Sequence, residues 1–72
     1  MRVSEFWDLV RDEFGRTQGP TLVRELVLFE LDNRTAEQAL DDGVPVRDVW
    51  LAMCDALDVP QARRWGSDRP AS

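Results

Sequence analysis

The sequence predicts a small all-α domain: four helices, the third of them short, packed around a central apolar helix. Every apolar run repeats at helical spacing, and none alternates as a half-buried strand would. Residues that cap helices stand at the ends of these runs. Seventy-two residues make one domain at most. We expect residues 1–65 to form this domain and the polar residues 66–72, which include Gly and Pro, to form a flexible tail.

The first two helices are predicted in residues 4–15, "SEFWDLVRDEFG", and residues 20–32, "PTLVRELVLFELD". Ser4 is the expected N-cap of the first, and Gly15 its end. The second helix begins with Pro20, which suits a first turn. It is apolar nearly all round, so we expect it to be buried on most sides and to form the centre of the domain.

The third and fourth helices are predicted in residues 35–43, "TAEQALDDG", and residues 44–58, "VPVRDVWLAMCDALD". Thr35 and Gln38 have the spacing of a capping box, and Gly43 is expected to end the third helix. The fourth helix carries one continuous apolar arc. We expect a core that includes Phe6, Trp7, Phe14, Trp50, Met53 and Cys54.

The charges are acidic overall, with 9 Arg against 14 Asp and Glu, net −5. Residues 1–59 carry 6 Arg and 13 acids, net −7, whereas residues 60–72 carry 3 Arg and 1 acid, net +2. An acidic body repels nucleic-acid phosphates and anionic membranes. Neither a signal peptide nor a membrane span is predicted, so we expect a cytoplasmic location.

Cys54 is the only cysteine in a chain without histidine, lysine or tyrosine. Its place on the apolar arc favours a buried, inert thiol. A redox-sensitive thiol, or a mixed disulfide between two copies, remains the alternative. A nucleophilic cysteine needs a neighbouring base or cation, and a Ser–His–Asp set cannot form without histidine. We therefore expect no enzyme activity and no cofactor.

Adjacent acids occur at Asp12–Glu13 and Asp41–Asp42. Neighbouring residues on a helix point in different directions, so we interpret these pairs as solvated surface. The spaced acids and glycine of a calcium loop are missing. The sequence therefore predicts no metal site.

A partial helix-turn-helix signature spans the third and fourth helices, because Ala39, Gly43, Val44 and Val49 have its spacing. Asp42 occupies a position that is normally apolar, and Arg47 is the only cation of the fourth helix. We interpret the motif as a helical corner without the charge for DNA. A helix-turn-helix-like protein associated with nucleic acid remains the alternative function.

Two features could bind a protein partner. The segment "ARRW" places Arg63 and Arg64 beside Trp65, and Arg and Trp are enriched at binding hot spots. Leu28 and Leu51 project outside the apolar arcs of their predicted helices, so we expect both to be among the more exposed leucines. The sequence thus favours a non-enzymatic interaction or regulatory module whose partner is an unknown protein or a second copy.

The segments "SEFW", "FG", "LDNRTAEQALDDGVPVRDVW" and "CDALDVP" resemble a group of small actinobacterial proteins catalogued as domain of unknown function 3046. The resemblance covers about residues 2–63, and residues 34–60 are its most specific part. It implies a small, all-helical intracellular protein without an assigned activity. It also implies genes near recombination genes, which points to a DNA-repair context. Asp32 and Asn33 replace a glycine pair of the family pattern, and Leu51 replaces a polar residue.

Overall fold

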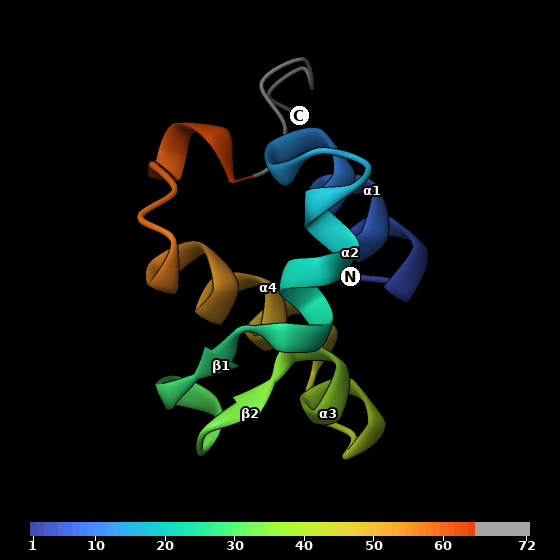
Figure 1. Cartoon of the computed structure of the whole chain (residues 1–72), viewed down its shortest axis with the longest axis vertical. Helices are drawn as coiled ribbons and strands as arrows, with labels where there is room; N and C mark the ends of the chain where they lie inside the picture. The colour runs from blue at the N-terminus through green and yellow to red at the C-terminus, as the bar shows by residue number, and fades with distance from the viewer. Residues whose placement is uncertain (65–72) are drawn as a thin grey trace.

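The computed structural model describes residues 1–64 and shows a helical molecule with one short hairpin (Figure 1). The order of elements in this part of the chain is α1 (Val3–Phe14), α2 (Gln18–Glu25), β1 (Val27–Leu28), η1 (Phe29–Leu31), β2 (Arg34–Thr35), α3 (Ala36–Asp41), α4 (Val46–Ala56) and η2 (Gln61–Arg63). The labels η1 and η2 denote 3₁₀-helices. The all-α class with four helices and a short third one is confirmed. The predicted tail, residues 66–72, lies outside the described residues.

Helix α1 is capped by Glu5 and not, as predicted, by Ser4. The backbone N–H of Arg2 donates to the Glu5 carboxylate at 3.0 Å, so the reach-back half of a capping box forms. Ser4 lies inside the helix and is exposed. Phe6, Leu9 and Val10 form the buried face of α1.

Helix α2 packs closely on α1 because Gly19 has no side chain. Gly19 is buried in the first turns of α2. A Cβ atom at this position would lie 2.7 Å from Cγ1 of Val10 and 3.1 Å from the Val10 carbonyl oxygen. The approach of the two helices therefore depends on this glycine.

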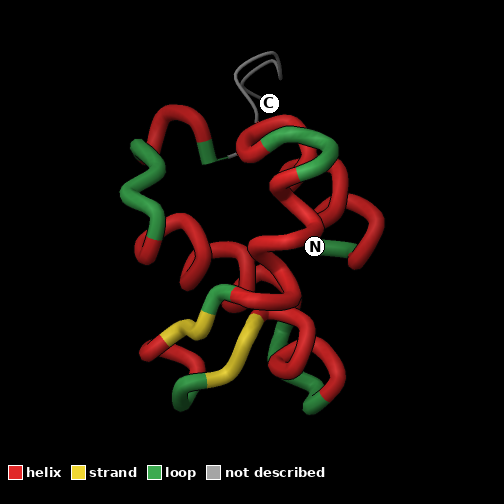
Figure 2. The backbone as a smooth tube through the Cα atoms, viewed as in Figure 1, coloured by secondary structure: helices red, strands yellow, loops and turns green. Residues whose placement is uncertain are grey.

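The predicted second helix is wrong beyond Glu25. Leu26 is extended, and Val27 and Leu28 then pair antiparallel with Thr35 and Arg34, respectively. Asp32 and Asn33 both adopt left-handed backbone angles, with φ of 57° and 61°, and this reverses the chain. Asp and Asn tolerate this conformation better than most residues. Figure 2 shows the two strands together at one end of the molecule.

The extended backbone changes which side chains face the core. Successive side chains of an extended chain point to opposite faces. Val27 is 50% exposed, Leu28 is 1% exposed, and Phe29 is 87% exposed. The prediction that Leu28 is among the more exposed leucines is therefore wrong. The most exposed side chain of this segment is that of Phe29.

The corner between α3 and α4 forms as the sequence predicts. The backbone N–H of Gln38 donates to the Thr35 hydroxyl at 3.2 Å, and the Thr35 N–H donates to the Gln38 side chain at 3.0 Å. Gly43 has φ +88°, and the Val44 N–H donates to the Ala39 carbonyl at 3.0 Å. These bonds end α3 in a Schellman motif.

The buried centre of the domain is α4 and not the predicted second helix. Its buried residues are Val49, Trp50, Ala52, Met53 and Cys54, whereas α2 buries only Gly19 and Val23. Of the predicted core, Phe6, Trp50, Met53 and Cys54 are buried, while Trp7 and Phe14 are half-buried against it. None of the helices in residues 1–64 combines the length and apolar character needed to cross a membrane.

We expect Gly19→Ala to destabilise the fold. The added methyl group overlaps Val10, and overpacking of this kind costs about 1–3 kcal/mol. Alanine's better helix propensity offsets up to about 1 kcal/mol of this loss. Urea unfolding should show a net loss of about 1–2 kcal/mol.

The control is the same substitution in a Val10→Ala background. Removing Cγ1 of Val10 leaves room for the new methyl group, so Gly19→Ala should cost less there than in the wild type. An equal cost in both backgrounds would show that close contact with the Val10 side chain is not the reason for glycine at position 19.

Candidate functional site

Both arginines of the predicted basic cluster form ion pairs with acids of the same chain. The Arg64 side chain is only 12% exposed and lies 2.8 Å from the Asp55 carboxylate, and its Nε donates to the Val59 carbonyl at 3.0 Å. Arg63 pairs with Glu13 at 2.9 Å. A partner-binding role for these arginines stays a prediction. Trp65, the third member of the cluster, lies outside the described residues.

Cys54 is fully buried, which confirms that it is a core side chain. The pKa of its thiol is raised from an ordinary value of 9.0 to about 11, chiefly by burial and to a smaller extent by the nearby carboxylates of Glu13 and Asp55. Arg64 lowers this pKa, but burial has the larger effect. The thiol is therefore protonated at neutral pH, and this disfavours the nucleophilic form.

The adjacent acids Asp41 and Asp42 are exposed, and Asp42 pairs with Arg34 at 2.9 Å. Within residues 1–64, no group of three or more His, Cys, Asp or Glu side chains lies close enough together to hold a metal ion. The geometry of Asp41 and Asp42 in the structure is thus that of surface residues.

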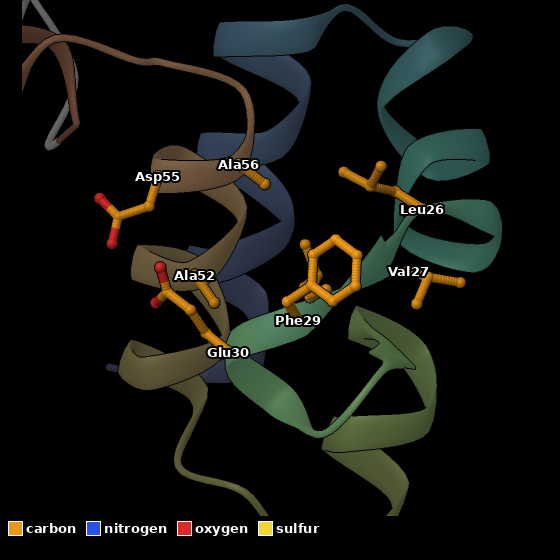
Figure 3. A pocket seen from close by; sticks show the side chains of 8 residues that line it. Leu26, Val27, Phe29, Glu30, Ala52, Asp55 and Ala56 are labelled. Carbon is orange, nitrogen blue, oxygen red and sulfur yellow. The ribbon is translucent and has the colours of Figure 1, made fainter.

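The most exposed large apolar side chain in the described part of the chain is Phe29, which borders a hollow of about 310 Å³ between β1, η1 and α4. This hollow is lined by Leu26, Val27, Leu28, Phe29, Glu30, Ala52, Asp55 and Ala56. Figure 3 shows the Phe29 ring between the alanines of α4 on one side and Leu26 and Val27 on the other. The side chains that line this hollow, which we call its floor, are therefore mainly apolar, and the solvent-exposed ring of Phe29 borders it.

A second hollow, of about 410 Å³, continues this surface along α4. It shares Glu30, Ala52 and Asp55 with the first, and its other lining residues are Leu31, Val44, Asp48 and Leu51. We call the surface lined by both hollows the β1–α4 face. Leu51, which we expected to be among the more exposed leucines, is half-buried within it. Leu28 lines the first hollow but is only 1% exposed, so it adds little accessible surface to the face.

A third hollow, of about 330 Å³, lies near the C-terminal end of the described chain. Glu13 and Arg63 line it together with Phe14, Gln18, Leu22, Leu57 and Val59. Its two charged residues pair with each other, and its apolar members are buried or half-buried. The third hollow is therefore a weaker candidate for partner binding than the β1–α4 face.

Sequence reasoning missed Val27 and Phe29, because it placed both on a buried helix. A signal for them was present. Val27, Leu28 and Phe29 form a short apolar run with β-branched and aromatic members, and Asp32–Asn33 follow as turn residues. A strand followed by a turn fits this composition as well as a helix does.

The fold and the face define a small acidic helical domain that exposes an aromatic ring, Phe29, on the β1–α4 face. The chain belongs to the family described as "Protein of unknown function (DUF3046)", whose model matches residues 1–62. The match includes all four α-helices and both strands. No curated protein and no solved structure matches the chain.

The raised pKa of Cys54 predicts a specific loss of stability at high pH. The folded thiol ionises near pH 11, and the unfolded thiol ionises near pH 9. Stability from this group is complete below about pH 9 and falls as the pH rises to 11, by about 2 kcal/mol in all. The chain has no lysine or tyrosine, so no other side chain titrates normally in this window.

Urea unfolding at several pH values, for the wild type and for Cys54→Ala, measures this loss. The variant should be less stable at pH 7, because a small cavity forms, but its stability should not fall between pH 9 and 11. A thiol reagent should also label folded wild type slowly at neutral pH. Parallel pH profiles of the two proteins, or rapid labelling, would contradict the inert thiol.

Proposed function

We propose that the protein is a non-enzymatic interaction or regulatory module that binds a protein partner through the β1–α4 face. One observation carries this proposal: the Phe29 ring is 87% exposed beside a hollow that is lined mainly by apolar side chains. A single exposed apolar residue needs no explanation. An aromatic ring beside two connected hollows resembles the anchors found at the centres of interfaces.

The chemistry of the side chains supports a binding role over catalysis. The only cysteine is buried and protonated, and the chain has no histidine or lysine to act as a general base. The charged residues of the β1–α4 face are Glu30, Asp48 and Asp55. We propose that this face needs neither a cofactor nor a metal.

The exposed position of Phe29 provides the test of the proposal. A photo-crosslinking side chain in place of Phe29 should trap a defined partner in living cells, and Phe29→Ala should abolish recovery of that partner by the tagged protein. Because Phe29 is largely solvated, the variant should change the free energy of unfolding by no more than about 0.5 kcal/mol.

A matched pair of valines controls for exposure. Val27 on the face and Val3 on α1 are each 50% exposed. Val27→Asp should weaken recovery of the partner, and Val3→Asp should not. If the two variants behave alike, the β1–α4 face is ordinary surface and the proposed function is wrong.

A helix-turn-helix-like role with nucleic acid, in a recombination or repair context, is the second candidate. The α3–α4 corner favours it, because Ala39 and Val49 are fully buried and Gly43 makes the turn. The charges oppose it, because α4 presents the exposed carboxylates of Asp48 and Asp55 beside Arg47, and its other side is core. DNA phosphates require cations at this position.

We therefore expect no specific binding to duplex DNA. A gel-shift series from about 0.05 to 0.2 M salt should show at most weak binding that disappears as salt increases. A sub-micromolar complex that persists at about 0.2 M salt would instead support the nucleic-acid role. Substitution of Arg47, Arg63 and Arg64 would then identify the contacts.

A further inference from the structure

We infer that the β1–α4 face binds a cationic amphipathic helix, which places apolar side chains in the two hollows and Arg or Lys against their rim. This inference rests on the proposed function and specifies the chemistry of the partner. All three charged residues that line the two hollows are acids: Glu30, Asp48 and Asp55. The face therefore combines apolar side chains with acids at its rim, one of which, Asp55, pairs with Arg64.

Two of the rim carboxylates are available to a partner. Some acids elsewhere in the described chain are engaged: Arg34 binds Asp32 and Asp42, Arg11 binds Asp8, and Arg63 binds Glu13. Within residues 1–64, Glu30 and Asp48 are exposed and have no ion pair. Incoming cations can therefore reach both.

The third rim carboxylate already binds a guanidinium group. Asp55 lies 2.8 Å from Arg64, which approaches from the end of η2. Figure 3 shows Asp55 and Glu30 on the same side of the Phe29 ring, at the α4 edge of the hollow. An arginine at this edge is thus compatible with the fold, and a partner's arginine beside Glu30 would repeat the same contact.

Charge disfavours a second copy of the chain as the occupant. Two copies joined through this face would bring both sets of rim acids together, in a protein of net charge −5. Like charges opposed across an interface are strongly unfavourable. The same argument disfavours nucleic acid and anionic membranes, whereas a cationic segment gains from the unpaired carboxylates of Glu30 and Asp48.

The shape of the face favours a helix over an added strand. Strand addition gains its affinity from a row of backbone hydrogen bonds, and β1 is only two residues long. The two hollows share Glu30, Ala52 and Asp55, so they lie next to each other along α4. Apolar anchors at positions i, i+3 or i+4, and i+7 of one helix suit neighbouring hollows.

The experiment uses a displayed library of helical peptides of about 16 residues, a length that can be helical in isolation. One face of each peptide varies among apolar residues, and each flanking position is Arg, Gln or Glu. Selection on the full-length protein should enrich Arg at the flanks and large apolar residues at helical spacing. Phe29→Ala should abolish binding of the selected peptides.

The role of the rim is tested on the best selected peptide. The double variant Glu30→Gln/Asp48→Asn should weaken its binding roughly 2- to 30-fold, since each exposed ion pair contributes modestly. The control, Asp12→Asn/Glu37→Gln, makes the same change in net charge on exposed acids outside the face. Glu37 also matches Asp48 in lying in the first turn of a helix. The control should change affinity less than about twofold.

The outcomes separate this inference from the proposed function. Arg enrichment, together with a selective loss in the rim variant, supports the inference. Selected peptides without Arg, or equal losses in rim variant and control, overturn the cationic partner but leave an apolar binding face. Failure to select any peptide that depends on Phe29 overturns both. A concentration-dependent dimer in light scattering that Phe29→Ala abolishes would show instead that the face joins two copies.

Discussion

The burial of the Trp50 indole is the constraint on which the rest of the described structure depends. Trp50 is fully buried and meets Phe6 edge-on, with ring centroids 6.3 Å apart, and Phe14 at 6.0 Å. Its N–H donates to the Arg64 carbonyl at 2.8 Å. A buried indole needs such an acceptor. Since the acceptor lies fourteen residues further on, the chain must fold back after α4.

The return of the chain explains the local geometry beyond α4. Asp58 adopts a left-handed φ of 55°, and the Val59 N–H donates to the Cys54 carbonyl at 2.9 Å, which ends α4 in a Schellman motif without glycine. Arg64 then reaches Asp55. The basic segment, which the sequence alone suggests is free, is thus held at Arg64 by its contacts with Trp50 and Asp55. As a result, one rim carboxylate of the β1–α4 face, that of Asp55, is already paired.

Apart from the N-cap of α1, sequence reasoning succeeded where structure depends on local chemistry and failed where it depends on distant contacts. The Thr35–Gln38 box and the turn at Gly43 follow from neighbouring residues, and the burial of Cys54 follows from helical spacing. The segment after Glu25 is apolar on all sides, so periodicity does not separate helix from strand. The pairing of Val27 with Thr35 and of Leu28 with Arg34 makes this segment a strand and not a helix. The resulting alternation buries Leu28 and exposes Phe29, so the candidate site could not be located from the sequence.

The two-residue strand β1, in place of the predicted helix, also forms one side of the β1–α4 face. Because β1 is short, η1 leaves the hairpin at once, and the Phe29 ring stays in solvent above α4. Covering a phenyl ring is worth about 1.5–3 kcal/mol, and this free energy would favour the proposed binding of a partner at Phe29. Glu30 and Asp48 add little affinity individually, but charge decides which partners approach and which are repelled. In the proposed complex, affinity would come from the apolar side chains of β1 and η1, and selectivity from Glu30 on η1 and Asp48 on α4.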